Sequence, residues 1–580
     1  FLRPLGLRLT WYYYDKDGNR VEDEWKKSGD NWFWLDSEEG GAMATDKLID
    51  DDNNTYYVDG NGVMVTNTWV KVVNEDQDDD DDPAEYRYYY MQSSGKAYKA
   101  GDSSNVKFKT IDGKKYAFDE DGKMLYGWVN KEDATLAMGD SDWEEATYYM
   151  GSWEDGALKT GWQKISVYDE DEDDDMDYWF NFKSNGEKRV NTKSDKDIFE
   201  KKLNGKYYGF DERGVMTYEW TAASTNDLTT ISNWRYFNSP EDGARSTKGW
   251  FKVVAPDADG DDNTFKDYGT GSTFAKGDAE DENERWYYAD SDGELYVGQI
   301  KKIKGKYYGF APEGNKAGSM LTGLCALTVD KDGNIVKLWD RDMDSDSLDD
   351  ALKGEGDFKD FGKSSFDTLY YFGNNEDSDG ALKTGNVTIN LDGDSYQFQF
   401  SKTGGAEGKG RGVNGIDDGK YIYKFGQKIK AGSDDKYIVV YADGDTGSTG
   451  VNVHKIDTAT LRSDYSASIG QNKDGDSVNY VGTLGELASG KLTSNYYLVN
   501  TSGAIVKNKT AAKDGNDWYF YVDEKVIKMY TNNNTLNDSK DYPNANLTAL
   551  KKNWDNTKYV VNNGKTVPTT PNDDLIDDGI

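Results

Sequence analysis

Side chains that commonly perform catalysis or bind metals are scarce in this chain, with the exception of carboxylates. Its 580 residues include one histidine, His454, and one cysteine, Cys325. A Ser/His/Asp triad, a multi-histidine metal site and a cysteine-based zinc finger therefore lack the residues they need. Two suitably spaced carboxylates can be found anywhere among 107 acidic residues, and no catalytic motif surrounds any of them. We expect a chain that is not an enzyme and needs no cofactor.

Acidic runs are the next candidates for chemistry, because clustered carboxylates can bind calcium. An EF-hand loop needs Gly at position six and Glu at position twelve. Counted from Asp169 these positions hold Asp174 and Phe180, and the count from Asp257 fails as well. No EF-hand is encoded and no metal site is predicted, although loose binding of divalent cations stays open. The runs are NEDQDDDDDPAEY at 74–86, YDEDEDDDMDY at 168–178 and APDADGDDN at 255–263.

The bulk composition limits the partners and the fold. A formal charge of -38 opposes attraction to nucleic acid, and no run of 18 apolar residues could span a membrane. Hydrophobic residues reach only 36% while aromatic residues reach 14%, which favours many small units packed through rings over one aliphatic core. Cys325 lies in the apolar run MLTGLCALTV, which predicts a buried, inert thiol. The segment FLRPLGLRLT lacks the features of a signal peptide, and we expect a mature fragment of a longer precursor.

One short pattern recurs along the chain and predicts β-hairpins. Alternating aromatic residues are followed by a turn whose Gly lies seven residues after the first ring. Rings in alternation read as strands, and Asp, Asn or Ser before Gly supplies the positive φ of a tight turn. Copies include WYYYDKDG at 11–18, YYYMQSSG at 88–95, WFNFKSNG at 179–186, YYGFDERG at 207–214, WYYADSDG at 286–293, YYGFAPEG at 307–314 and YYLVNTSG at 496–503.

Groups of these short repeats recur with a longer period of roughly 90 residues. Three hairpin types alternate in fixed order. One hairpin is not stable in water, so we expect consecutive hairpins to stack and to bury their rings against each other. The acidic runs would then be solvated tips of one type, with Asp169 to Asp177 pointing outward and repelling other molecules. The three types are marked by Tyr116, Tyr208, Tyr308 and Tyr423; by Trp69, Trp162 and Trp250; and by Trp128 and Trp220.

The stretch WKKSGDNWFWLDSEEGGAMATD at 25–46 resembles the cell-wall-binding, or choline-binding, repeat family, which is related to glucan-binding repeats. Similar stretches are FKTIDGKKYAFDEDGKMLYGW at 108–128 and KKLNGKYYGFDERGVMTYEW at 201–220. The resemblance implies an all-β solenoid of stacked β-hairpins with about three hairpins per cycle. We expect a short N-terminal segment at 1–10, the solenoid at 11–430, a divergent β-rich region at 431–490, further hairpins at 491–530 and an Asn- and Asp-rich tail at 531–580.

The resemblance also implies where a ligand would bind. Members that bind choline hold its trimethylammonium group between hairpins, among the faces of several rings and often a Met. The interaction is physically sound because a quaternary ammonium cannot donate hydrogen bonds, and each ring face contributes about 0.5 to 2 kcal/mol. Sugar stacking and purely structural roles for the same rings stay open. The corresponding residues are Trp25 with Trp32 and Met43, Trp69 with Tyr88, Trp162 with Trp179, and Trp250 with Trp286.

Three functions remain open at this point. The first is a secreted protein of the bacterial cell surface that attaches to cell-wall choline or to glycans without catalysis. The second is a structural surface protein, a spacer or a fibre whose copies stack end to end through terminal rings. The third is a binding part of an enzyme or toxin whose catalytic part lies outside this chain.

Overall fold

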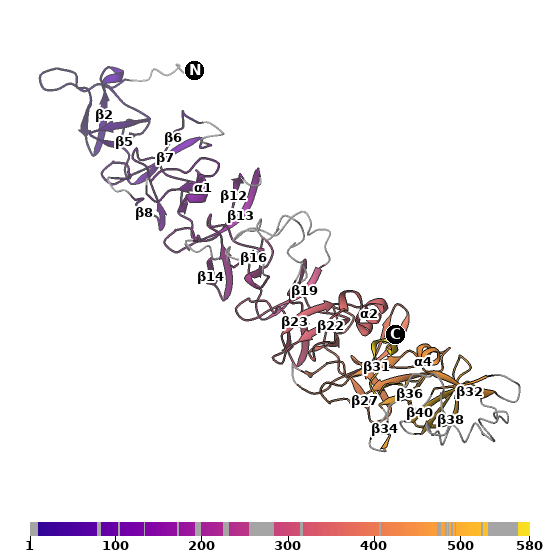
Figure 1. Cartoon of the computed structure of the whole chain (residues 1–580). Coiled ribbons are helices and arrows are strands. Elements are labelled where there is room, and N and C mark those ends of the chain that lie inside the picture. The colour runs from indigo at the N-terminus through magenta and orange to yellow at the C-terminus, as the bar shows by residue number, and fades with distance from the viewer. Residues whose placement is uncertain are drawn as a thin grey trace, which may run out of the picture. The chain divides into compact units, whose positions relative to one another are not determined.

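A computed structural model describes residues 10–77, 83–101, 105–132, 134–170, 173–191, 199–223, 231–254, 284–313, 317–404, 408–471, 477–481, 484, 487–488, 491–492, 495–523, 526–531 and 567–579. Its contacts divide the chain into two units (Figure 1). Unit 1 comprises residues 1–246 and 260–276, and unit 2 comprises 247–259 and 277–580. Most of the acidic runs at 74–86 and 168–178 lies within the described residues, whereas the run at 255–263 lies outside them.

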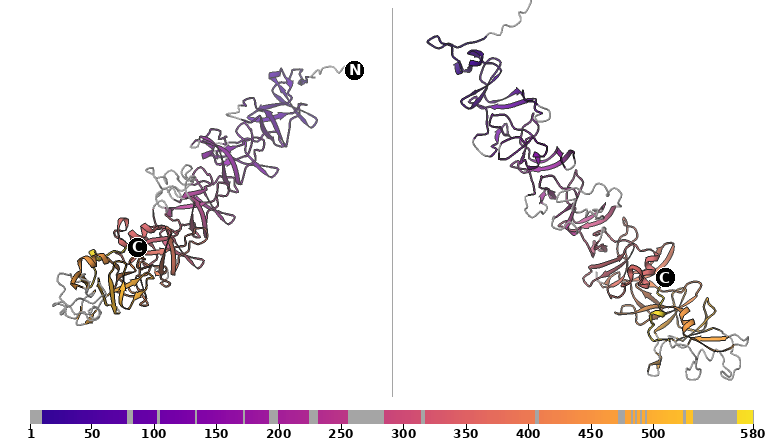
Figure 2. Two further views of the ribbon diagram at one scale, coloured as in Figure 1. Left: turned by 90° about the vertical axis from the view of Figure 1, so that its right-hand side faces the viewer. Right: turned by 45° about the horizontal axis from the view of Figure 1, so that its top comes forward.

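Unit 1 consists of antiparallel hairpins, each a sheet of two strands apart from the three-stranded sheet at its start. Successive hairpins follow one another in chain order in all three views (Figures 1 and 2). The described elements are β1 (Glu24–Ser28), β2 (Asn31–Asp36), β3 (Ala42–Met43), β4 (Lys47–Asp51), β5 (Asn54–Val58), β6 (Thr68–Val73), β7 (Tyr86–Met91), β8 (Lys109–Ile111), β9 (Lys114–Tyr116), β10 (Trp128–Val129), α1 (Asp142–Glu145), β11 (Tyr148–Tyr149), β12 (Gly161–Asp169), β13 (Asp174–Phe182), β14 (Phe199–Leu203), β15 (Lys206–Phe210), β16 (Glu219–Ala222) and β17 (Trp234–Phe237).

Two-residue turns with positive φ close several hairpins between their strands. Asp112 and Gly113, between β8 and β9, have φ of 47° and 80°. Asn204 and Gly205, between β14 and β15, have φ of 48° and 88°. Two consecutive left-handed residues form the turn whose twist matches that of the flanking strands. Local sequence therefore fixes the register of these hairpins. The predicted Gly turns of the recurring pattern lie elsewhere, after the second strand, and there the Gly has positive φ, as at Gly186 and Gly293, while the residue before it does not.

One backbone hydrogen bond joins each of these hairpins to the one before it. Its donor is the N–H at what we call the linking position, a residue shortly after the second strand. Its acceptor is the carbonyl oxygen of a residue in the preceding hairpin. We call the place of this residue the first-ring position, because the first aromatic residue of the recurring pattern occupies it in many copies. Because only backbone atoms take part, the side chain at the linking position can vary. The unit 1 pairs are Met43 to Trp11, Met64 to Trp32, Ala97 to Thr55, Met124 to Tyr88, Leu158 to Lys115, Lys188 to Thr147, Met216 to Trp179 and Arg245 to Tyr207.

Unit 2 begins with two similar hairpins and continues with larger sheets. These have the orders β23-β22-β24, β25-β26-β29-β28-β27, β31-β30-β36-β37 and β32-β33-β40-β39-β38. The elements are β18 (Gly249–Val254), β19 (Glu284–Ala289), β20 (Gln299–Ile303), β21 (Lys306–Phe310), β22 (Leu324–Val329), β23 (Ile335–Asp340), α2 (Ser345–Lys353), β24 (Asp367–Tyr371), β25 (Gly385–Leu391), β26 (Asp394–Phe400), β27 (Gly415–Asp417), β28 (Tyr421–Lys424), β29 (Gln427–Lys428), β30 (Tyr437–Ala442), β31 (Val453–Ile456), α4 (Thr458–Asp464), β32 (Ser466–Gln471), β33 (Ser477–Val481), β34 (Leu487–Ala488), β35 (Lys491–Leu492), β36 (Tyr496–Asn500), β37 (Ile505–Val506), β38 (Asn508–Lys513), β39 (Tyr519–Asp523) and β40 (Val526–Tyr530).

The core of unit 2 is more aliphatic than the hairpins. Cys325 on β22 is fully buried beside Leu327 and Tyr370, which confirms the predicted buried thiol. Burial raises the pKa of this thiol to about 12. The part of the Asn- and Asp-rich tail within the described residues is packed, because Leu575 is fully buried in the cluster that contains Phe520.

The acidic hairpin β12–β13 differs from its prediction at one residue. Asp169 and Asp174 are the last pair of its ladder, and Asp173, Asp174 and Asp175 are exposed as expected. Asp169 is only 2% exposed and accepts a hydrogen bond from the Tyr178 hydroxyl at 2.6 Å. The expectation that every acid from Asp169 onward points outward is therefore wrong at Asp169, because a cation from another hairpin compensates its charge.

Candidate ligand cages

The opening tryptophan of one hairpin type packs against a tyrosine of the next hairpin in a reproducible geometry. The ring centroids lie about 5 Å apart and the planes are steeply inclined, the edge-to-face arrangement that aromatic rings prefer. The same tryptophans also contact a phenylalanine two residues further on. The tyrosine pairs are Trp69 with Tyr116 at 4.9 Å and 68°, Trp162 with Tyr208 at 4.9 Å and 64°, and Trp250 with Tyr308 at 4.8 Å and 69°.

A second tryptophan stands at right angles to the first in two of these hairpins. Trp162 and Trp179 have centroids 6.4 Å apart and an interplanar angle of 82°. Trp250 and Trp286 repeat this with 6.4 Å and 85°. Strand pairing explains why the two geometries match. The first tryptophan of each hairpin pairs with a residue of the second strand, and the second tryptophan lies two residues before that partner. The two tryptophans are therefore diagonal neighbours on one face of the hairpin. All four rings are half-buried.

The following hairpin brings a methionine backbone to each of these pairs. The Met216 N–H donates to the Trp179 carbonyl at 2.8 Å, and the Met320 N–H donates to the Trp286 carbonyl at 2.8 Å. Each site thus combines two perpendicular tryptophans, a tyrosine of the next hairpin and a methionine at the linking position. We call these the Trp162 cage and the Trp250 cage.

A carboxylate binds the second tryptophan in both cages. The Trp179 Nε1–H donates to Glu241 Oε2 at 3.1 Å, and the Trp286 Nε1–H donates to Asp377 Oδ1 at 3.0 Å. A lysine on the facing strand binds the same acid, Lys164 at 2.8 Å and Lys252 at 2.9 Å.

These contacts hold the carboxylates in their charged form. The lysine contact, followed by the indole contact, lowers the pKa of Glu241 and that of Asp377 below their ordinary values. Each lysine also lies near a second acid, Asp177 at 3.6 Å and Glu376 at 2.9 Å. Each group of one lysine and two acids therefore has a net negative charge beside the second indole, whose orientation is fixed by a hydrogen bond.

The two earlier candidate sets are arranged differently. Trp69 and Tyr88 pack against one cluster that contains Tyr116 and Met124. Tyr88 also lies 6.4 Å from Trp153, an indole that takes the place of the acids in the later cages. The Trp69 set is thus also a group of rings from two hairpins.

In the first hairpin, Trp25 contacts Trp34 at 5.3 Å and Tyr56 at 5.1 Å. Trp32 is 40% exposed, and its carbonyl accepts from Met64. Met43 instead lines a hollow of about 300 Å³ with Trp11 and Tyr13. The residue that the repeat pattern brings to Trp32 is therefore Met64.

Sequence reasoning did not assign several of these residues. Tyr116, Tyr208 and Tyr308 were markers of the longer period, and their common spacing from an opening tryptophan could have identified them as walls of the cages. Glu241 and Asp377 lie in related phrases, SPEDGARSTKGW and EDSDGALKTGN, but at different distances from the phrase's glycine. That shift hides their common position.

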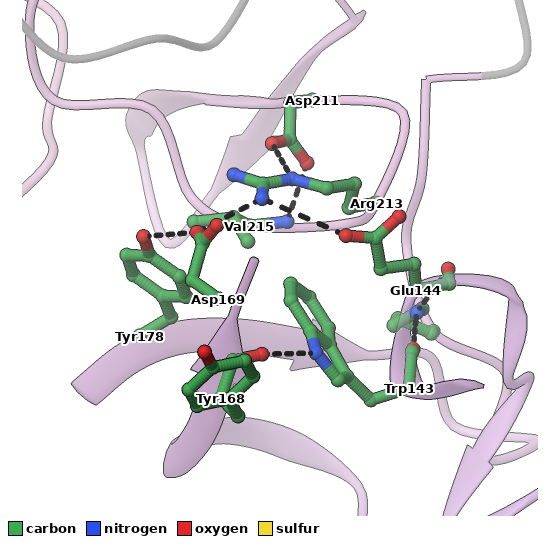
Figure 3. Close-up of polar contacts among 9 residues, drawn as sticks. Trp143, Glu144, Tyr168, Asp169, Tyr178, Asp211, Arg213 and Val215 are labelled. Atoms are coloured by element: carbon green, nitrogen blue, oxygen red, sulfur yellow. Dashed lines mark hydrogen bonds and ion pairs between the residues drawn. The ribbon is translucent and has the colours of Figure 1, made fainter. Parts of the chain in front are cut away.

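A buried charge network joins the hairpin β12–β13 to its neighbours (Figure 3). Arg213 Nη1 lies 2.9 Å from Asp169 Oδ2, and Arg213 Nε lies 3.1 Å from Asp211 Oδ2. Glu144 lies 3.8 Å from the same guanidinium. Burial raises the pKa of Asp211 to about 6, although Arg213 opposes this rise. The groups satisfy each other, which indicates a structural role.

Other chemistry is not evident in the part of the chain that the structure describes. There, no group of three or more His, Cys, Asp or Glu side chains is placed to hold a metal ion. The same residues contain no helix long and apolar enough to cross a membrane. His454 Nδ1 lies 2.8 Å from Asp578 Oδ2, a contact that fastens the C-terminal residues.

Comparisons with known proteins give one match in sequence and several in structure. No protein-family profile matches the chain. It is 30% identical over 188 residues to Glucosyltransferase-S of Streptococcus mutans, a match that covers 32% of this chain and 11% of that protein. The matched part thus spans about a tenth of this curated relative.

The comparison with solved structures matches, among others, two proteins from Streptococcus pneumoniae. Choline binding protein F, solved with a peptidoglycan analogue, is 16% identical with a TM-score of 0.34, covering 66% of this chain and 98% of that one. The choline-binding domain of CbpL is 18% identical with a TM-score of 0.25, covering 48% and 100%. The repeats and the sequence match to the glucosyltransferase confirm the resemblance of this chain to the choline-binding and glucan-binding repeat family.

Proposed function

We propose that this chain is a non-enzymatic attachment module that binds choline groups of cell-wall polymers through the Trp162 and Trp250 cages. The observation that carries the proposal is the recurrence of one arrangement: two perpendicular indoles, a tyrosine of the next hairpin and a methionine at the linking position. Such ring faces attract a cation that has no hydrogen to donate. The proposal includes secretion to a bacterial cell surface and stacking of the hairpins into a solenoid.

The carboxylates support a cationic ligand over a neutral one. Glu241 and Asp377 stand at the second indole of each cage and keep their negative charge through their lysine partners. A trimethylammonium group is attracted by the net negative charge without a directional contact, whereas a neutral sugar stacked on the same rings gains only where one of its hydroxyl groups is placed to donate to the acid. Both acids are exposed, so we expect their effect on affinity to weaken as salt concentration rises.

The test is choline binding by calorimetry, with one cage removed at a time. We expect Trp179→Leu and Trp286→Leu each to weaken one site by about 2-fold to 30-fold, from about 0.5 to 2 kcal/mol per ring. Tyr14→Ala is the matched control, because this ring is 58% exposed and lies outside both cages. Retention on purified cell walls, and release by free choline, should follow the same order.

Two results would redirect the proposal. Binding to an α-glucan that choline does not displace would assign the rings to sugars. Absence of binding to choline, cell walls and glucans alike would refute attachment.

A fibre assembled end to end is the second candidate, and the exposed rings of Trp11, Tyr12 and Tyr14 favour it. Discrete single molecules by electron microscopy at high protein concentration would contradict the fibre.

A further inference from the structure

A fourth set of rings in unit 1 repeats the geometry of the cages. Trp128, which opens β10, lies edge-to-face with Phe180 of the next hairpin at 5.1 Å and 71°, and it contacts Phe182 at 6.1 Å. The distances to Tyr208 and Phe210 in the Trp162 cage are 4.9 and 5.7 Å. Trp128 and Phe180 therefore occupy the positions of the first indole and the next-hairpin ring.

The remaining wall comes from a different part of the chain. Thr147, not a ring, occupies the first-ring position in this hairpin. Trp143 of the short helix α1 instead contacts Trp128 at 6.5 Å and Phe180 at 5.8 Å. Its indole N–H donates to the Tyr168 carbonyl at 2.8 Å, which fixes the ring (Figure 3). The space is thus enclosed by three rings, as in a complete cage.

The residue at the linking position here is Lys188, where the other cages have methionine. Its Nζ lies 5.1 Å from the Trp128 centroid, 5.9 Å from Phe180 and 6.0 Å from Trp143. The same nitrogen donates to the carbonyl oxygens of Trp143 at 2.7 Å and Glu144 at 2.9 Å. Lys188 is 4% exposed. A cation within about 6 Å of ring centroids is attracted by them, most strongly when it is desolvated.

We propose that the space between Trp128, Trp143 and Phe180 is a cation cage for an ammonium group, and that the Lys188 side chain is its built-in occupant. This assignment does not depend on whether the Trp162 and Trp250 cages bind choline. The side chain at the linking position then distinguishes the sets: lysine closes the Trp128 set with the protein's own ammonium, whereas the Trp162 and Trp250 cages have methionine there and their occupancy by a ligand rests on the proposed function. Arg245 occupies the same position in a later hairpin, with its guanidinium 4.5 Å from the Tyr207 centroid.

The experiment removes the occupant and supplies it again from solution. Lys188→Ala deletes three methylene groups and the ammonium, and n-propylammonium has the same composition. The full-length variant is studied at pH 6, below the value of about 7 to which burial lowers the pKa of Lys188. Hydrogen–deuterium exchange of the amides in residues 141–150 reports on the local structure. 1-Propanol is the neutral probe of similar size, sodium chloride controls for ionic strength, and Lys183→Ala on the same hairpin is the matched variant.

We expect n-propylammonium to restore protection in Lys188→Ala at a concentration at least tenfold below that needed with 1-propanol. The wild type and Lys183→Ala should show no such response. Equal effects of the cation and the alcohol, or no restoration by either, would overturn the proposal. If Lys188→Ala does not fold unaided, its refolding yield is compared with either additive present. Recovery with the cation alone supports the cage, and any other result overturns it.

Discussion

Replacing Arg213 by leucine should open the hairpin β12–β13 locally, because two buried carboxylates would lose their shared cation. Asp169 is 2% exposed and Asp211 is 5% exposed, and both lie within 3.1 Å of the guanidinium. Removing one partner of a buried ion pair costs about 3 to 5 kcal/mol. The lower end applies if Asp211 takes up a proton, since its pKa already stands at about 6. The remaining cost comes from Asp169, which keeps its bond from Tyr178.

Hydrogen–deuterium exchange of the amides in residues 161–182 measures this cost as a local opening free energy. A loss of about 3 to 5 kcal/mol corresponds to exchange faster by about a hundredfold to a few thousandfold. Lys183→Leu, an exposed change on the same hairpin, should leave exchange within about threefold of wild type. Adding Asp169→Asn and Asp211→Asn to Arg213→Leu should recover most of the protection. Exchange in Arg213→Leu that matches the control would refute the reasoning.

Three further predictions concern other buried groups. Burial lowers the pKa of Lys188 to about 7, so between pH 7 and its ordinary value of 10.5 the unfolded chain binds the additional proton. Stability from this group therefore rises by about 1.4 kcal/mol per pH unit in that range, and the difference in thermal unfolding between wild type and Lys188→Met should show this slope. Asp578→Ala leaves Lys424 buried without this acid and should destabilise β28 by about 3 to 5 kcal/mol; unchanged amide exchange there would contradict it. Cys325 should react with a disulfide reagent only after denaturation, and labelling of the native protein would disprove its burial.

The hairpins were predictable because their determinants are local. Alternating rings specify each strand, and pairs such as Asp112-Gly113 specify turns, within about ten residues. The stems that carry Trp162 and Trp179 show the same alternation on either side of the acidic tip. Predicting the cages also requires knowing which hairpins are neighbours, since Tyr208 comes from the next hairpin. The fixed order of the repeats supplies this information.

Residues with distant partners were not predictable in the same way. The inward position of Asp169 depends on Arg213, which follows it by 44 residues and belongs to another hairpin. Trp143 lies in DSDWEEA, a segment without ring alternation. In unit 2, β30 pairs with β36 across a long sequence separation, and the recurring pattern marks β36 but not its partner.

At the linking position the backbone N–H bonds to the preceding hairpin, while the side chain faces the rings or the core. One of the contacts that join neighbouring hairpins thus depends on an amide that every amino acid except proline possesses. A substitution there can therefore change the side chain and keep the backbone bond, and the change affects both ligand capacity and packing, since Met124 is buried beside Tyr116. Methionine and lysine codons differ by a single nucleotide, so a lineage could gain or silence a binding site in one mutational step while the repeats stay joined.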